Sequence, residues 1–363
     1  MHELSYRFAV DDAMTAEERI EIARAHAKAA GLRYVYDSDP GYARRKRGKG
    51  MSYIHPDGKP LKDKTVILRI NALAIPPAYS NVWICVHDNG HIQATGFDAR
   101  GRKQYRYHPE WRAARDDNKF GNMRVFGACL PSLRRKVQAA LNLDGLPKDK
   151  VIAAIVRLLD KTGLRVGSDA YLAENATCGL TTISKKHVDL HGKEIELDFP
   201  AKGGKRYQGS LTDPKVAKVI SLCEDLPGYR LFKWVDEDGE TRTVSSSDVN
   251  EWLQDKTGAA ITAKDFRTWT ACALFLDEAM ETTRCCVDAK ELKLKPILKT
   301  VSEQLGNTPA ILQKSYVHPE LIDLYRTGCM LNREWQHDDK DHVPAGYRKT
   351  EALLLRWLEK TYP

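Results

Sequence analysis

The segment spanning residues 301–316 constrains the C-terminal part of the chain more than any other stretch, because it carries strong helix stop and start signals. Gly306 and Asn307 are suited to end one helix, since both residue types tolerate the left-handed conformation. Thr308 can cap the next helix. Pro309 suits the first helical position because proline has no N–H group to leave unpaired. Two helices joined by a tight turn are therefore predicted here.

The second of these helices is predicted over residues 309–318, because Pro319 stops it. Tyr316 then lies in its last turn, beside Lys314 and Ser315. A phenol is a weak nucleophile at neutral pH unless neighbouring cations lower the cost of its negative charge. Because the chain has 15 tyrosines and most tyrosines only pack, Tyr316 becomes a catalytic candidate only if other segments supply cations.

Length and composition limit the class of protein. The chain has 363 residues, which predicts two domains, and its 42% hydrophobic and 29% charged residues are typical of a soluble protein. The formal charge of +8 favours a polyanionic partner. The eight cysteines form no CxxC pair and no zinc spacing, so reduced thiols are expected. Residues 1–19 hold no apolar signal core and no run approaches a membrane span, so the cytoplasm is the expected location, without a membrane partner.

The N-terminal part is predicted to be rich in β-strands. A helix is expected over residues 16–31, and residues 51–110 alternate in the manner of strands separated by turns. Between them, residues 44–49 read Arg-Arg-Lys-Arg-Gly-Lys and are expected to form a loop. A solvated loop and a targeting signal are the alternatives to a phosphate-contacting loop, which fits the rest of the chain best and makes Arg44 and Arg45 candidate DNA contacts.

The end of this β-rich part has the composition of a nucleic-acid contact. A strand period of two places Lys103, Tyr105 and Tyr107 on one face of the strand. The other face then holds Gln104, with Arg102 and Arg106 on either side of it. Cations can hold phosphates, while glutamine and tyrosine can reach base edges. A solvent-facing strand with a mixed surface is the alternative.

The rest of the chain is predicted to be mostly helical. Residues 178–211 predict a small three-stranded sheet, starting with the segment Gly-Leu-Thr-Thr-Ile. Residues 141–150 are polar enough to form a linker, so a domain boundary falls within residues 115–150. The prediction is an α+β protein with a β-rich domain at residues 1–115 and a mostly α-helical domain at residues 116–363.

Several blocks of the sequence resemble type IB DNA topoisomerases. The following blocks come in the order and rough spacing of that family's catalytic boxes: LRVGSDAYLAENATCGLTTISKKHVDL (164–190), FPAKGGKRYQGSL (199–211), KDFRTWTA (264–271) and GNTPAILQKSY (306–316). Two further blocks resemble the family's short form, found in poxviruses and bacteria: IPPAYSNVWI (75–84) and QATGFDARGRKQYRYHP (93–109). The resemblance covers roughly residues 35–325, and the ends beyond it receive no role.

The resemblance implies a catalytic site. It makes Tyr316 the nucleophile that forms a 3′-phosphotyrosyl link, and it makes Arg165 and Arg267 the cations that bind the scissile phosphate. Planar guanidinium groups suit a phosphate better than lysine does. Lys202, in the turn between two strands of the small sheet, is implied as the acid that protonates the leaving 5′ oxygen, with Lys205 as a rival for that role. Because the phosphotyrosyl ester stores the phosphodiester energy, religation is expected to need neither ATP nor a metal.

The resemblance also implies contacts around this site and one departure from the family. Many members carry histidine where this chain has Asn307, which can donate a hydrogen bond to a phosphate oxygen but cannot titrate near neutral pH. Tyr171 matches a position that the family uses to contact DNA, as do the strand residues 104, 105 and 107. The implied protein is a monomer that closes as a clamp around double-stranded DNA in the nucleoid, without a cofactor.

Two other readings of the sequence are open. Tyrosine recombinases share the Arg, Lys, Arg, Tyr chemistry, but they carry histidine three residues before the second arginine, where this chain has Lys264. Their helical N-terminal domain also does not fit the β-rich block. A non-enzymatic DNA-binding protein could keep the basic surface, although Tyr316 and both arginines are present.

Overall fold

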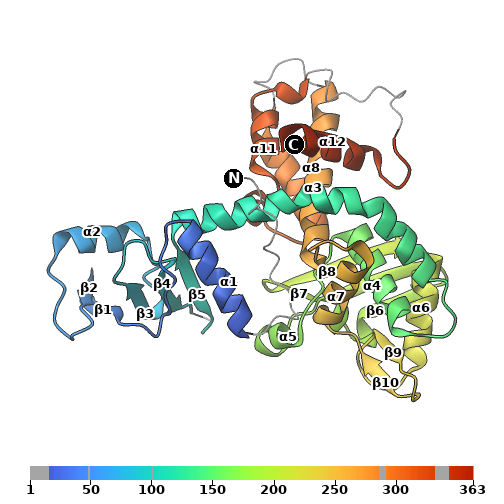
Figure 1. Ribbon diagram of the computed structural model, residues 1–363, viewed down its shortest axis with the longest axis horizontal. Coiled ribbons are helices and arrows are strands. Elements are labelled where there is room, and N and C mark those ends of the chain that lie inside the picture. Colours follow the sequence, from blue (N-terminus) through green and yellow to red (C-terminus); the bar gives the residue numbers. More distant parts are fainter. Residues whose placement is uncertain (1–15, 48–49, 100, 286–291, 332–342, 363) are drawn as a thin grey trace. The chain divides into compact units, whose positions relative to one another are not determined.

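The computed structural model describes residues 16–47, 50–99, 101–285, 292–331 and 343–362. The chain divides into two compact units, residues 14–119 and residues 120–363 (Figure 1). The dividing point lies within one long helix, α3 (Pro109–Ala140). None of the helices in the described segments is long and apolar enough to cross a membrane.

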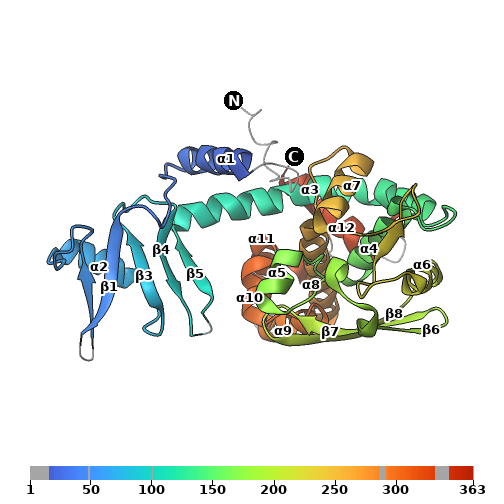
Figure 2. The same cartoon turned by 90° about the horizontal axis from the view of Figure 1, so that it is seen from below.

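The first unit is built on a five-stranded antiparallel sheet in the order β2-β1-β3-β4-β5 (Figures 1 and 2). Its elements in chain order are α1 (Ala16–Ala29), β1 (Gly41–Arg47), β2 (Gly50–Ile54), α2 (Lys64–Ala72), β3 (Ser80–Cys85), β4 (Ile92–Phe97) and β5 (Lys103–Tyr107). Asp63 caps α2 by accepting from the backbone N–H groups of Thr65 and Val66. Ile70 of this helix joins Ile84 of β3 in the core of the unit, so the hydrophobic side of α2 anchors it to the sheet.

The predicted basic loop is wrong in one respect. Residues 44–47 belong to strand β1, and residues 48–49 lie outside the described residues. The prediction rested on the positive charge of residues 44–49, and charge alone does not determine the backbone conformation. The strand forms because β1 pairs with β2 on one side and β3 on the other, and this pairing outweighs the low strand preference of the charged residues.

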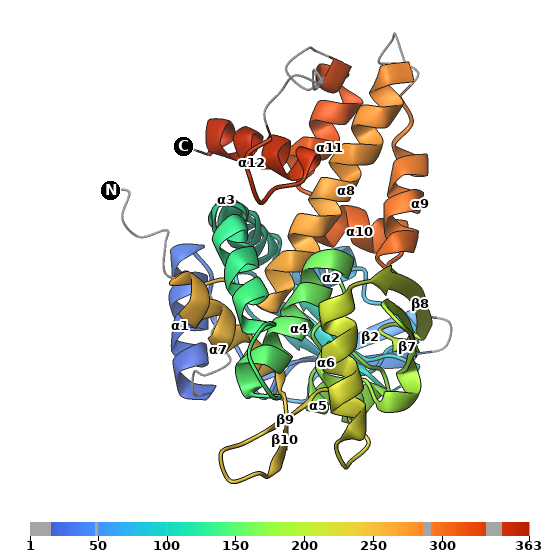
Figure 3. The same ribbon diagram turned by 90° about the vertical axis from the view of Figure 1, so that its right-hand side faces the viewer.

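The second unit is mostly helical and holds a three-stranded antiparallel sheet, β6-β7-β8, and a two-stranded sheet, β9-β10. Its strands are β6 (Val188–His191), β7 (Glu194–Ala201), β8 (Lys205–Thr212), β9 (Lys233–Val235) and β10 (Thr241–Thr243). Its helices after α3 are α4 (Lys148–Thr162), α5 (Asp169–Asn175), η1 (Leu180–Thr182), η2 (Lys185–His187), α6 (Pro214–Asp225), α7 (Ser246–Thr257), α8 (Ala263–Cys285), α9 (Leu294–Gln304), α10 (Pro309–Ser315), α11 (Pro319–Arg326), η4 (Cys329–Leu331) and α12 (Lys349–Thr361). The central helix is α8, which packs against α4, α7, α9, α11 and α12 (Figure 3).

The three-stranded sheet was predicted with the wrong first strand. Residues 180–182 form the 3₁₀ helix η1, because the N–H groups of Leu180 and Thr181 donate to the carbonyls of Arg165 and Val166. The small sheet instead begins at Val188. The segment after α4 is therefore held by a 3₁₀ turn, and this matters for the position of Arg165.

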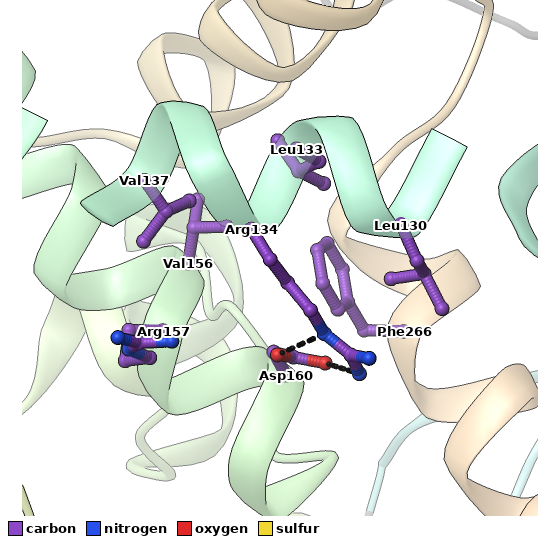
Figure 4. A pocket seen from close by; sticks show the side chains of 8 residues that line it. All are labelled: Leu130, Leu133, Arg134, Val137, Val156, Arg157, Asp160 and Phe266. Carbon is purple, nitrogen blue, oxygen red and sulfur yellow. Dashed lines mark hydrogen bonds and ion pairs between the residues drawn. The ribbon is translucent and has the colours of Figure 1, made fainter. Parts of the chain in front are cut away.

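A buried ion network joins three helices of the second unit. The guanidinium of Arg134 on α3 donates to Asp160 on α4 at 2.7 Å and to Glu351 on α12 at 2.7 Å. Asp160 and Phe266 lie beside Arg134 in a small cavity (Figure 4). The carboxylate of Glu351 also accepts from the indole N–H of Trp269 at 3.3 Å. The network thus connects the C-terminal helix with α4, which precedes Arg165, and with α8, which carries Arg267.

We expect Arg134→Met to lower the free energy of unfolding by about 3–5 kcal/mol, because it leaves two buried carboxylates without their cation. The side chains of Asp160 and Glu351 are only 11% and 2% exposed. Urea unfolding followed by circular dichroism measures the change. Arg135→Met, one residue along the same helix and exposed, is the matched control. Equal loss of stability in both variants contradicts this role of the network.

Candidate active site

The turn between α9 and α10 was predicted correctly, but the end of α10 was not. Gly306 has a φ of +61°, and the hydroxyl of Thr308 accepts from the N–H of Ile311 at 3.3 Å as the N-cap. The helix ends at Ser315, however, three residues before the predicted end at 318. Tyr316 is its C-cap residue with a φ of −136°, so it does not lie in the last helical turn. The next helix, α11, already has its N-cap at His318.

The backbone of Tyr316 is fixed by contacts from two helices. Its N–H donates to the carbonyl of Leu312 at 2.9 Å, and its carbonyl accepts from the thiol of Cys272 on α8 at 3.3 Å. The guanidinium carbon of Arg267, also on α8, lies 5.1 Å from the centroid of the Tyr316 ring. This half-buried tyrosine is therefore held next to a buried cation.

Asn307 brings the two predicted arginines together. Its side-chain oxygen accepts from Arg165 Nη2 at 3.0 Å and from Arg267 Nη2 at 2.9 Å. Asn307 is 4% exposed and Arg267 is 3% exposed. Arg165, Arg267, Asn307 and Tyr316 thus form one cluster, although they come from three separate parts of the chain.

Each arginine is positioned by the backbone around it. Arg165 follows Gly163, the left-handed C-cap of α4 with a φ of +63°, and the carbonyl of Arg165 accepts from Leu180. Arg267 Nη1 donates to the carbonyl of Gly163 at 2.6 Å, and its Nη2 donates to the carbonyl of Leu305 at 2.5 Å. Arg267 therefore ties the end of α4 to the end of α9 while it faces Tyr316.

The charges of the cluster favour an anionic ligand. Burial raises the pKa of the Tyr316 phenol, but the positive charges of Arg165 and Arg267, and hydrogen bonds with both, outweigh it, so this pKa lies below its ordinary value. Burial, together with the charge of Arg165, lowers the pKa of Arg267 to about 10. That guanidinium is still protonated at neutral pH. Two cations thus share one amide oxygen and lack a carboxylate partner of their own among the described residues.

Two buried donors in the cluster have no hydrogen-bond partner within the described chain. They are the amide nitrogen of Asn307 and Nε of Arg267. A buried donor without an acceptor costs roughly 1–3 kcal/mol. An anion with several oxygens, such as a phosphate, matches this surplus of donors.

The predicted acid, Lys202, lies in the turn between β7 and β8. It is exposed, and its ammonium lies 4.7 Å from the ring centroid of Tyr171 on α5. Its rival, Lys205, donates from its ammonium to the backbone carbonyl of Asn307. Of the two lysines, Lys205 is the one that the structure connects directly to the cluster.

Comparisons with known proteins agree with this chemistry. Residues 108–336 match the family described as eukaryotic DNA topoisomerase I, catalytic core, and residues 50–98 match the bacterial DNA topoisomerase IB N-terminal domain. DNA topoisomerase 1B of Acanthamoeba polyphaga mimivirus is 31% identical over 82% of this chain and 91% of its own length. The chain belongs to the type IB DNA topoisomerases.

More distant comparisons add little to this assignment. DNA topoisomerase 1B of vaccinia virus (strain Copenhagen) is 23% identical over 64% of this chain and 71% of its own length. A solved XerH site-specific recombinase bound to a palindromic difH substrate aligns at 14% identity, with a TM-score of 0.36 over 57% of this chain and 51% of the recombinase. A likeness this low carries no argument. The family match decides for a type I topoisomerase over the recombinase and the non-enzymatic alternatives.

In the first unit of this topoisomerase, strand β5 has the predicted alternation. Lys103 lies 5.7 Å above the ring of Tyr105, and the rings of Tyr105 and Tyr107 stack with centroids 5.8 Å apart. Lys103 also pairs with Asp37 at 2.5 Å. Gln104, on the other side of the strand, donates to Asp98 at 3.0 Å. Lys103, Tyr105 and Tyr107 thus form one surface, while Gln104 is directed to a neighbouring carboxylate.

The two arginines of β1 differ in their surroundings. Arg44 donates to three backbone carbonyls, those of Ile75, Pro76 and Tyr79, at 3.0, 2.9 and 2.7 Å. Its guanidinium therefore holds the loop before β3 in place. Arg45 is exposed, so of the two it is the one whose side chain faces solvent.

Sequence reasoning missed two residues that shape the site. Cys272 holds the backbone of Tyr316, and Glu351 accepts from Trp269, two residues after Arg267 on α8. Cys272 directly follows the block that contains Arg267, but a lone buried cysteine has no sequence signature of its own. Glu351 lies outside every block of the resemblance.

Proposed function

We propose that this type IB topoisomerase relaxes supercoiled double-stranded DNA by cutting one strand with Tyr316, allowing strand rotation, and resealing the same bond. The observation that carries the proposal is the pair of guanidinium groups that share the amide oxygen of Asn307 beside the Tyr316 phenol. Cations fixed in advance around a nucleophile stabilise the charge that builds on a phosphate under attack.

The cleavage step uses five side chains. The Tyr316 oxygen forms a bond to phosphorus, and its proton leaves to solvent. Arg165, Arg267 and the free amide N–H of Asn307 donate to the non-bridging oxygens. The bond from phosphorus to the 5′ oxygen breaks, and Lys202 gives that oxygen its proton. The 5′ hydroxyl later attacks the 3′-phosphotyrosyl ester, returns the proton to Lys202 and frees Tyr316.

DNA binding is assigned to both predicted domains, residues 1–115 and 116–363. The β5 surface of Lys103, Tyr105 and Tyr107 combines a cation with two aromatic rings, and Tyr171 lies beside the proposed acid. The two domains act as a clamp around the duplex, and the protein works as a monomer on DNA in the nucleoid of the cytoplasm. Filter binding of the parent protein at increasing salt tests this part, because phosphate contacts make affinity fall steeply with salt.

We expect relaxation to proceed in EDTA without nucleotide. The phosphotyrosyl ester conserves the energy of the broken bond, and guanidinium groups supply the charge stabilisation that a metal supplies elsewhere. A plasmid relaxation ladder after chelation is the measurement. A strict requirement for magnesium or ATP contradicts the proposed chemistry.

The role of Asn307 predicts a graded effect. Asn307→Ala is expected to slow cleavage about ten- to a hundredfold, because it removes a phosphate donor and the oxygen that the two arginines share. Asn307→His should stay active, since imidazole can donate the same hydrogen bond. Single-turnover cleavage of an oligonucleotide from about pH 5 to 9 separates them, since only the histidine variant gains a titration near the ordinary histidine pKa. An alanine variant as fast as the parent at every pH places Asn307 outside the reaction.

A further inference from the structure

The turn that carries Lys202 has little to hold it. Ala201 pairs with Lys205 across the β7–β8 hairpin, so residues 202–204 form the connection. Gly203 and Gly204 have φ values of +86° and +75°, and no atom lies within 4 Å of a Cβ placed on Gly203. Glycines in open space allow many backbone conformations. A proton donor, however, has to lie within hydrogen-bond reach of the oxygen that it serves.

The strands of this hairpin pack against the core of the second unit. Two lysines near its turn make further contacts, which are different in kind. The Lys202 ammonium rests over the ring of Tyr171, an interaction that ends when Lys202 turns toward DNA. The Lys205 ammonium donates to the backbone carbonyl of Asn307. That carbonyl belongs to the residue whose side chain already joins Arg165 and Arg267. Lys205 therefore connects the sheet to the phosphate-binding cluster and does not depend on the position of Lys202.

We propose that Lys205 is a positioning residue, which fastens the β7–β8 hairpin to the Asn307 turn so that Lys202 can deliver its proton to the leaving 5′ oxygen. The proposal rests on the proposed function. Two other roles of Lys205 make different predictions. A charge that only stabilises the phosphate affects every leaving group alike, and a direct proton donor cannot be replaced by arginine, whose pKa is too high for proton transfer.

The test compares cleavage of two suicide oligonucleotides, one with the natural 5′-bridging oxygen and one with sulfur, which leaves without a proton. Lys205→Met is expected to slow cleavage of the oxygen substrate about ten- to a hundredfold, the scale of a small misplacement of a catalytic group. Its rate on the sulfur substrate should stay within about threefold of the parent. Lys205→Arg, which keeps a donor for the carbonyl, should cleave both substrates at nearly the parent rate. The double variant Lys202→Met/Lys205→Met should be no slower than Lys202→Met alone, because Lys205 acts through Lys202.

Lys193→Met, at the opposite end of the same sheet and exposed, is the matched control and should match the parent. Equal slowing of Lys205→Met on both substrates overturns the proposal in favour of a charge effect. Loss of oxygen-substrate cleavage in Lys205→Arg overturns it in favour of Lys205 as the acid. Failure of the parent to cleave either substrate speaks against the proposed function instead, and it is seen before any variant is measured.

Discussion

Tyr316→Phe is expected to abolish relaxation while leaving DNA affinity within about threefold of the parent. The variant removes the phenolic oxygen, which both arginines contact, whereas affinity comes from phosphate contacts spread over the protein. The ring that packs beside Arg267 is kept, so the fold should not change. Plasmid relaxation and filter binding of the same preparation give both numbers.

The matched control for this variant is Tyr229→Phe, because Tyr229 is 68% exposed and lies outside the proposed mechanism. It should relax DNA like the parent. The next tyrosine along the chain, Tyr325, is fully buried and packs against Phe275. Relaxation by Tyr316→Phe at a rate near the parent shows that another residue attacks the DNA.

Arg165→Ala and Arg267→Ala are each expected to slow single-turnover cleavage at least about a hundredfold, the scale of removing one preorganised donor from a charged transition state. Arg165→Ala is the cleaner test, because Arg267 also holds the carbonyls of Gly163 and Leu305. Arg267→Ala should therefore lower the melting temperature as well. The sulfur substrate should restore neither variant, because the arginines do not supply the leaving-group proton.

Arg284→Ala is the control on the same helix as Arg267, since Arg284 is exposed near the end of α8. It should cleave at the parent rate. Recovery of both arginine variants on the sulfur substrate contradicts the division of roles. If Arg165→Ala cleaves at the parent rate, the contact between Arg165 and the Asn307 amide oxygen has no part in the mechanism.

Local signals were enough to predict the turn around Asn307. Glycine, threonine and proline have strong positional preferences at helix ends, and Gly306, Thr308 and Pro309 occupy the expected positions. The end of α10 is not a local matter. Tyr316 leaves the helix where Cys272 and Arg267 of α8 contact it, and no signal in the neighbouring sequence reports contacts with a helix more than forty residues earlier.

The arrangement of the cluster depends on tertiary contacts, which the sequence around each residue does not predict. Arg165 and Asn307 are 142 residues apart in sequence and share one hydrogen bond. Resemblance to a family pointed to both, but not to the geometry in which one amide oxygen serves two guanidinium groups. For the same reason, the sequence did not predict the network of Arg134, Asp160 and Glu351. Its partners are up to 217 residues apart.

In the first unit, too, local patterns were predictable and tertiary contacts were not. The alternation of β5 was predictable because strand period alone places Lys103, Tyr105 and Tyr107 on one surface. The sequence could not distinguish Arg44 from Arg45. Pairing of β1 with its neighbours directs one guanidinium to three carbonyls and leaves the other exposed.

The proposed mechanism depends on a covalent bond between Tyr316 and the 3′ end of the cut strand. A suicide oligonucleotide that loses its short 5′-hydroxyl fragment after cleavage traps this bond, and mass spectrometry of the digested adduct locates it. We expect one modified peptide, which contains Tyr316 and carries the nucleotides on the 5′ side of the cut through a 3′-phosphate. An adduct on Tyr325 or another residue, or a link to the 5′ end of the strand, contradicts the mechanism.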